Sequence, residues 1–256
     1  AEVITGKPWR ELVRANVLEP AGMRDTGWDD GSRVPGLAVG CFRARDGAPE
    51  PSEQDMSHIE AAGGIWSTVG DLYRFDRALR GDALLDRATR ERMVTPRAGN
   101  YACFWQNAPI HGHACIQHSG GANGYVADFL RFVDDDAGVV VLSNYAFAPI
   151  LRVSHDLAAI LFDAEYGKPL ATAPATLDGL AGVYRWPGAG MQTVVRRSGK
   201  ALLAFDLIPG AERCGGRLLV PLGEATFAEA MGDARLVFAR DGDGPVIRRV
   251  VDGKPT

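Results

Sequence analysis

The polar segment with the clearest chemical content is residues 117–125, Gln-His-Ser-Gly-Gly-Ala-Asn-Gly-Tyr. The imidazole of His118 and the hydroxyl of Ser119 can hold or transfer protons, and the glycines that follow leave the backbone accessible to a bound molecule. A Gly-x-Ser-x-Gly nucleophile elbow around Ser119 is excluded, because residue 117 is glutamine and no helical pattern follows the serine. Alone, such a segment is typical of a strand end whose glycines form a turn.

Two other groups of residues raise the question of a metal site. His111 and His113 would face one side of a strand and so form a possible metal pair. No third ligand lies near them in the sequence, which favours a solvated hairpin tip instead. The four cysteines show no Cys-x-x-Cys spacing and are expected to be free and mostly buried: Cys41, Cys103, Cys115 and Cys214. We therefore expect no metal and no cofactor.

The elements around these residues follow a recognisable order. Helical patterns open at Lys7-Pro8, at the capping sequence of residues 67–71, and over 86–94. Strand patterns cover 101–106 and 114–118, and 125–133 forms a hairpin with 138–143. Residues 138–142 are apolar on both faces, which predicts a strand in the middle of a covered sheet, and a helix is expected over 149–166. This order predicts an α+β fold, in which helices cover an antiparallel sheet.

A change in composition divides the chain. Residues 167–176 are rich in proline and alanine and are predicted to link a domain at 1–166 to a second domain at 177–256. Short alternating segments with regular turns follow the linker, which predicts a small all-β barrel or sandwich. The alternating apolar residues there are expected to build a core rather than a ligand cavity.

Four segments, in the right order, resemble one family. Residues 5–9 with 18–26 are similar to the Gly-Lys and Pro-Leu-Gly-Met stretch of serine β-lactamase-like and penicillin-binding-protein-like proteins, which include class C β-lactamases and esterases. Residues 61–72 resemble their Ala-Ala-Gly-Gly and Ser-Thr-x-x-Asp-Leu segment. Residues 118–125 resemble their His-Thr-Gly-Gly version of the Lys-Thr-Gly motif, and 139–144 match the strand after it. The resemblance covers about residues 1–165, and parts of 177–227 resemble a lipocalin-like domain often attached to this family.

The resemblance implies an acyl-serine mechanism and a role for each matched residue. Among the catalytic residues, His118 would replace the motif's lysine, Ser119 the threonine whose hydroxyl binds substrate, and the N–H of Gly121 would be an oxyanion-hole donor. Gly120 would leave room for substrate along the strand. A wall of the substrate cleft would come from Ala62, Gly63 and Gly64.

Two departures from the family pattern limit what this chain can do. It contains no Ser-x-x-Lys and no Tyr-x-Asn, so we expect the nucleophile to lie in a missing N-terminal half of the same domain and this chain alone to be inactive. Histidine, with a reference pKa of about 6.5, binds an anionic carboxylate less well at neutral pH than lysine does. That favours an ester, amide or peptide substrate over efficient β-lactam turnover. The alternative is a non-catalytic binding protein that keeps the fold.

The composition of the chain excludes some classes of binding partner. The net charge of −4 argues against nucleic acid, and no apolar stretch approaches the length of a membrane span. The expected partner is a small-molecule or peptide substrate. The family resemblance favours a periplasmic or secreted location, with the cytoplasm as the alternative.

Overall fold

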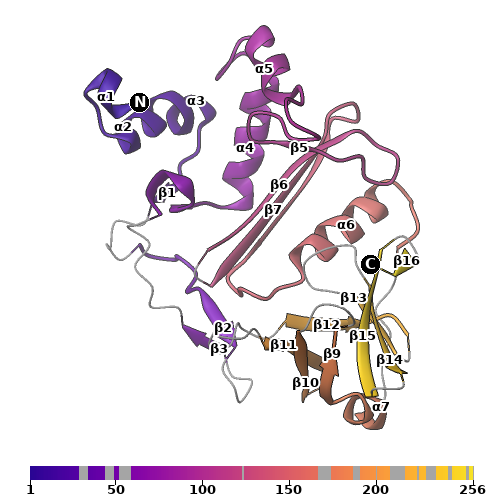
Figure 1. The fold of residues 1–256 in the computed structure, drawn as a ribbon. Helices are drawn as coiled ribbons and strands as arrows, with labels where there is room; N and C mark the ends of the chain where they lie inside the picture. The colour runs from indigo at the N-terminus through magenta and orange to yellow at the C-terminus, as the bar shows by residue number, and fades with distance from the viewer. Residues whose placement is uncertain are drawn as a thin grey trace. The chain divides into compact units, whose positions relative to one another are not determined.

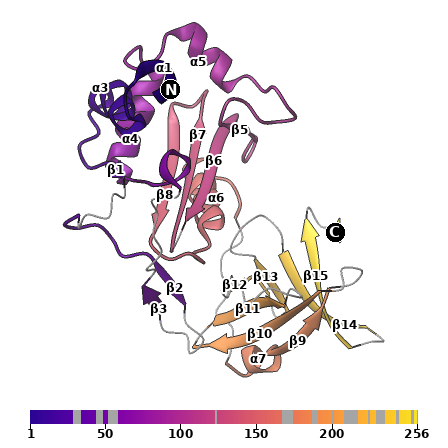
Figure 2. The ribbon, with the colours of Figure 1, turned by 60° about the vertical axis from the view of Figure 1, so that its left-hand side comes forward.

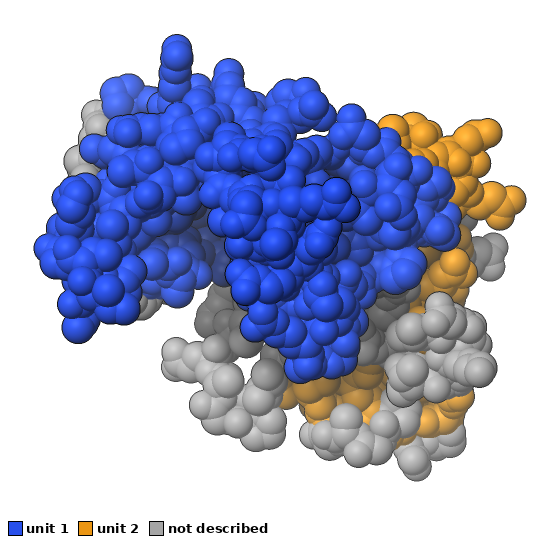
Figure 3. Space-filling model, turned by 90° about the horizontal axis from the view of Figure 1, so that it is seen from above, with its two compact units in different colours: residues 1–39, 52–144 blue, residues 40–51, 145–256 orange. Residues whose placement is uncertain are grey.

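The computed structural model describes residues 1–28, 34–43, 49–51, 59–122, 124–166, 174–186, 191–199, 201–207, 217–223, 225–228, 235–241, 244–251 and 254–255. The chain forms two compact units, residues 1–39 with 52–144 and residues 40–51 with 145–256 (Figure 3). Both combine strands with helices, and their sheets are almost entirely antiparallel, which confirms the α+β class. Because 167–173 lie outside the described residues, the linker at 167–176 and the domain limits drawn from it stay predictions.

The first unit begins with short helical segments and continues with two longer helices (Figure 1). Their bounds are α1 (Glu2–Thr5), α2 (Trp9–Val13), the π-helical η1 (Arg14–Leu18), α3 (Glu19–Ala21), the 3₁₀-helical η2 (Glu60–Ala62), α4 (Val69–Arg80) and α5 (Arg87–Val94). The hydroxyl of Thr68 accepts the Asp71 N–H at 3.1 Å, and the carboxylate of Asp86 accepts the Thr89 N–H at 2.7 Å. These side chains cap α4 and α5, so both predicted helices are confirmed.

A four-stranded antiparallel sheet, in the order β5-β6-β7-β8, forms the other half of this unit (Figures 1 and 2). The strands are β5 (Gln106–Asn107), β6 (Cys115–Ala122), β7 (Tyr125–Phe132) and β8 (Ala137–Ser143). Every second residue of β7 is buried, which fixes its register because a slip by one residue would reverse the two faces. Between α4 and the sheet lies a core of buried residues, Leu79, Ala102, Trp105 and Ile116.

Two strand predictions were wrong. The strand expected over 101–106 is only Gln106–Asn107, because the chain turns back within this segment: Tyr101 pairs with Gln106, and the Ala102 N–H donates to the Trp105 carbonyl at 2.8 Å. Among the described residues β8 is an outer strand, not a central one. Apolar residues on both faces of a strand indicate that other elements cover both faces. They do not indicate whether the strand is paired on one edge or on both.

Ion pairs fix α4 to the sheet. Asp76, which is buried on α4, lies 2.7 Å from Arg80 Nε and 3.3 Å from Arg131 Nε on β7. Arg80 also pairs with Asp136 in the turn between β7 and β8, and donates to the Ala137 carbonyl at 3.3 Å. Burial lowers the pKa of Arg131, and the nearby Asp76 carboxylate opposes that effect. The helix therefore holds β7 through buried charges, and it contacts the β7–β8 turn through the exposed carboxylate of Asp136.

The carboxylate of Asp71 joins two segments that are distant in the sequence. It is fully buried, and its Oδ2 accepts the Asp25 N–H and the Thr26 hydroxyl, both at 2.7 Å. Arg74 donates to Oδ1 at 2.6 Å, and the Thr26 hydroxyl also lies 2.7 Å from that of Ser67. Burial alone would raise the pKa of Asp71, but the hydrogen bonds from Thr26, Asp25 and Arg74 hold it below its ordinary value.

A short two-stranded sheet reinforces this junction. β1 (Gly27–Trp28) pairs with β4 (Ile65–Trp66), with Gly27 opposite Trp66. A Cβ at residue 27 would lie 2.5 Å from the Trp66 indole, so only glycine fits. Asp71 and this pairing therefore join the residues at 18–28 to those at 61–72.

The second unit contains a closed barrel. It is preceded by β2 (Cys41–Arg43), β3 (Pro49–Pro51), α6 (Ile150–Leu161) and α7 (Pro174–Gly179). The barrel strands are β9 (Gly182–Arg185), β10 (Gln192–Ser198), β11 (Ala201–Leu207), β12 (Arg217–Pro221), β13 (Thr226–Ala228), β14 (Arg235–Asp241) and β15 (Gly244–Val251), and β16 (Lys254–Pro255) pairs with β15. The predicted small barrel is confirmed. Buried Leu177 of α7 packs among interior residues such as Leu202, Phe227 and Ile247, so side chains fill the centre.

No helix among the described residues is long and apolar enough to cross a membrane.

Replacing Asp71 with asparagine tests the junction. Because the folded-state pKa of Asp71 is depressed, its contribution to stability is complete above the unfolded pKa of about 3.9 and is lost as the pH falls through the folded value. Asp71→Asn should lower the free energy of unfolding by about 1–3 kcal/mol at neutral pH, with the difference shrinking below about pH 4. Urea denaturation at several pH values measures this.

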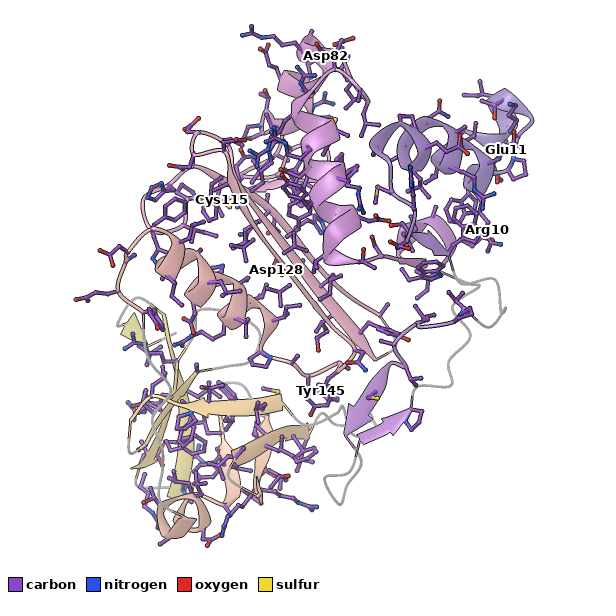
Figure 4. The ribbon with its side chains drawn as sticks, turned by 180° about the vertical axis from the view of Figure 1, so that it is seen from behind. Arg10, Glu11, Asp82, Cys115, Asp128 and Tyr145 are labelled. Carbon is purple, nitrogen blue, oxygen red and sulfur yellow. The ribbon has the colours of Figure 1, made fainter. Side chains whose placement is uncertain are left out.

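The matched control is Asp82→Asn, since Asp82 is exposed and its carboxylate pairs with Arg90 at the surface (Figure 4). That change should lower the free energy of unfolding by less than about 1 kcal/mol. This account of the junction would be contradicted if Asp71→Asn lowered the free energy of unfolding equally at every pH. It would also be contradicted if Asp71→Asn lowered it no more than Asp82→Asn does.

Gly27→Ala should lower the free energy of unfolding by about 1–3 kcal/mol, because the new methyl group overlaps the Trp66 indole. Gly70→Ala in the first turn of α4 is the control: its Cβ would lie 3.8 Å from the nearest atoms, and alanine favours a helix. The control should be neutral or stabilising. Equal denaturation midpoints for the two variants would show that the close approach at Gly27 is not a constraint.

Candidate active site

The four residues of the His-Ser-Gly-Gly motif lie together on one strand. They are the exposed second half of β6, whereas its first residues, Cys115 and Ile116, are buried. β5 pairs only with Ile116 and Gln117, so the outer edge of β6 from His118 onward has no paired strand among the described residues. Such an edge offers a row of backbone donors and acceptors to an extended ligand.

The turn between β6 and β7 determines which backbone groups reach this edge. Ala122 and Tyr125 are paired, and only two residues lie between them. In so short a turn the two paired residues form a hydrogen-bonded pair, in which each N–H donates to the carbonyl of the other residue. Pairs alternate along an antiparallel ladder, and Gly121 opposite Val126 is therefore a pair without hydrogen bonds. The same alternation points Cys115 outward, and its carbonyl does accept the Ala108 N–H at 3.0 Å.

Ser119 and Gly121 consequently direct their N–H and C=O groups away from β7, toward the open edge. His118 and Gly120 instead use theirs to pair with β7. The far end of this hairpin is fixed, because the Tyr125 hydroxyl donates to the Ala38 carbonyl at 2.7 Å. The geometry thus leaves the Gly121 N–H where it can stabilise an oxyanion of a molecule bound along the edge.

The ring of His118 is held by two hydrogen bonds. Its Nδ1 lies 2.8 Å from the Ser119 carbonyl oxygen, and its Nε2 lies 2.8 Å from the hydroxyl of Tyr101. A carbonyl can only accept, so Nδ1 carries the proton, and in the neutral ring Nε2 accepts the tyrosine proton. The two rings also meet edge to face, with centroids 6.1 Å apart.

Sequence reasoning did not identify Tyr101 as a site residue. It precedes His118 by 17 residues, and it is held in the turn at 98–101, next to buried Ala102 and close to buried Trp105. It was assigned only to a strand, and no motif marks it. Tyr101 lies beside His118 because residues 93–107 pack against the same hydrophobic core as β6.

The segment predicted as a cleft wall has a defined local structure. Ala62 ends η2, and the Gly64 N–H donates to the Glu60 carbonyl at 2.8 Å. A Cβ on Gly64 would lie 2.9 Å from that oxygen, so glycine is required there. No hydrogen bond joins residues 62–64 to residues 118–121 in the part of the chain that the structure describes. The proposed role of Ala62, Gly63 and Gly64 stays a prediction.

Other reactive groups do not form a competing site. Cys115 lies on β6 and Asp128 on β7 (Figure 4), and burial raises the pKa of the Cys115 thiol to about 12, so it is not a thiolate at neutral pH. His111 and His113 lie at a turn, as favoured above, and His113 Nδ1 is 3.0 Å from Asp135 Oδ2. The described residues hold no group of three potential metal ligands among His, Cys, Asp and Glu.

Comparison with known proteins identifies the family of the chain. The family model for beta-lactamase matches residues 1–161. Penicillin-binding protein 4* of Bacillus subtilis is 27% identical over 195 residues, which are 66% of this chain and 42% of that protein. Protein Rv1367c of Mycobacterium tuberculosis is 33% identical over 102 residues, 37% of this chain and 25% of that protein. The chain thus spans less than half the length of these relatives.

Solved structures agree on the fold. The octameric penicillin-binding protein homologue from Pyrococcus abyssi superposes with a TM-score of 0.61 at 20% identity, over 99% of this chain and 59% of that one. A penicillin-binding protein from Bacillus halodurans gives a TM-score of 0.53 at 20% identity, over 63% of this chain and 51% of that one. Since the family model matches well over half of the residues, this chain belongs to the beta-lactamase family.

Proposed function

We propose that this chain supplies the substrate-binding edge of a serine hydrolase that acts on an ester, amide or peptide through an acyl-serine intermediate. The observation that carries the proposal is the open edge of β6, where Ser119 and Gly121 direct backbone N–H groups outward beside the exposed imidazole of His118. Membership of a family that includes serine hydrolases supports it.

The proposed reaction proceeds in two steps. A serine Oγ attacks the substrate carbonyl carbon, and the negative charge that develops on the carbonyl oxygen is stabilised by the N–H of Gly121. The bond to the leaving alcohol or amine breaks, and the leaving group departs with the proton that the serine hydroxyl gave up. Water then attacks the acyl-serine, which releases the acid and restores the serine hydroxyl.

The nucleophile is proposed to come from outside these 256 residues, since no serine in them is followed three residues later by lysine. Ser119 is exposed on β6, and the described residues place no lysine against it. In this proposal Ser119 therefore binds substrate and does not attack it. A non-catalytic binding protein that keeps the fold is the rival proposal, because an open strand edge binds an extended ligand with or without turnover.

Substitution of Gly121 tests the proposed oxyanion donor in the product of the complete reading frame. Gly121→Pro removes the N–H, and because that N–H faces the open edge, the change costs no hydrogen bond to β7. The rate of p-nitrophenyl acetate hydrolysis should fall by about 100-fold or more. Gly121→Ala is the control: it keeps the N–H, and its Cβ would lie 3.3 Å from Val126 Cγ1, so a loss of less than about tenfold is expected.

Circular dichroism must first show that both variants fold. Equal rates for folded Gly121→Pro and Gly121→Ala would remove Gly121 from the oxyanion hole. Labelling with a fluorescent fluorophosphonate, which carries no carboxylate, separates the two functions: the complete product should be labelled on a serine, and these 256 residues alone should not. Saturable labelling of a serine within this chain would contradict the proposal, and a complete product that binds peptides but is never labelled would establish the binding protein instead.

A further inference from the structure

The hydrogen bonds of His118 leave an unusual set of polar groups at the open end of β6. The Nδ1–H donates to the Ser119 carbonyl, which would otherwise face the edge as an acceptor, and Nε2 takes the proton of Tyr101. Both ring nitrogens are thus occupied by protein groups. A neutral imidazole held in this way has no N–H left to give to a ligand.

The group that remains at this position is the phenolic oxygen of Tyr101. It donates its single proton to Nε2, so toward a ligand it can only accept. Tyr101 is 37% exposed and His118 is exposed, so a ligand can reach this oxygen. The hydroxyl of Ser119 cannot replace a donor at the same point, because successive side chains of a strand point to opposite faces.

We propose that Tyr101 is a specificity-determining residue, which by occupying Nε2 of His118 makes this end of β6 accept an amide N–H or ammonium group and reject a carboxylate. A carboxylate carries only acceptors, and placed against the Tyr101 oxygen it would lose hydrogen bonds to water and gain none. An amide N–H meets an acceptor there, and its backbone can continue along the N–H and C=O of Gly121.

This inference rests on the proposed function, since only a hydrolase would have a substrate at this site. It adds the substrate class: an extended amide or peptide with no free carboxylate beside His118. It also gives His118 a different role from the one expected from the family motif, that of a weak substitute for a carboxylate-binding lysine. In the structure the ring is a positioning group, because its two nitrogens hold Tyr101 and the Ser119 carbonyl in place.

The tautomer of the His118 ring tests whether Tyr101 occupies Nε2. It can be measured in this chain, and the measurement does not require enzymatic activity. At about pH 8, where an ordinary histidine is neutral, the ¹⁵N and ¹³C chemical shifts of the ring report which nitrogen carries the proton. The Nδ1–H form is expected in the wild type and in Tyr73→Phe, a control at an exposed tyrosine on α4. Tyr101→Phe should raise the population of the Nε2–H form, because only the Ser119 carbonyl then favours a proton on Nδ1. A dominant Nε2–H form in the wild type would overturn the role of Tyr101.

Binding of two achiral peptides tests whether this end of β6 accepts an amide and rejects a carboxylate. N-acetylglycylglycine and its C-terminal amide differ only in the carboxylate, and NMR titration of the Ser119 and Gly121 amides gives their dissociation constants. The amide should bind about tenfold more tightly than the acid to the wild type and to Tyr73→Phe. The preference should vanish in Tyr101→Phe and reverse in His118→Lys, which restores a charged donor.

An acid that binds the wild type as well as the amide does, or a His118→Lys variant with the wild-type preference, would overturn the inference. Failure of both peptides to bind up to their solubility limit would overturn the substrate class. A complete product that shows the expected preference but hydrolyses no ester or amide would refute the proposed hydrolase and leave the selectivity of the edge established.

Discussion

The short turn between Ala122 and Tyr125 is the constraint on which the site depends. Two residues between paired strands allow only one hydrogen-bonded arrangement of the closing pair, and that arrangement sets the alternation along all of β6. A slip of the register by one residue would direct the N–H groups of His118 and Gly120 to the open edge in place of those of Ser119 and Gly121, and it would also turn every side chain of β6 to the other face. The chemistry assigned to the edge is thus a consequence of strand register as much as of residue type.

The rest of the first unit holds this hairpin against a fixed support. Asp76, Arg80 and Arg131 connect α4 to β7, and Asp71 joins the start of the same helix to the loop that contains Thr26. Buried charges of this kind are costly unless every partner is present, so they specify one arrangement of helix and strands more than they stabilise it. The network therefore fixes β7 against α4, and β6 is held through its pairing with β7 along its whole length.

Sequence reasoning predicted the elements whose signals are local. The helix start at 67–71, the helix over 86–94, the β7–β8 hairpin and the barrel all follow from short-range patterns, and the four family segments indicated β6 as the candidate site strand. The contact between Tyr101 and His118 could not be predicted, because it depends on how residues 93–107 fold over Trp105, and no spacing rule relates a turn to a neighbouring strand. The outer position of β8 among the described strands was missed for a related reason, since strand order is a long-range property.

Amide hydrogen exchange along β6 tests the central claim most directly, because it reports which N–H groups are bonded to β7. In this 256-residue chain the amides of His118 and Gly120 should exchange slowly, and those of Ser119 and Gly121 should exchange rapidly. The alternation should persist in Tyr101→Phe, which changes only the side-chain contact to His118. Protection of the Gly121 amide equal to that of Gly120 would show that the N–H is already bonded within the protein. It could then neither bind an extended ligand nor stabilise an oxyanion.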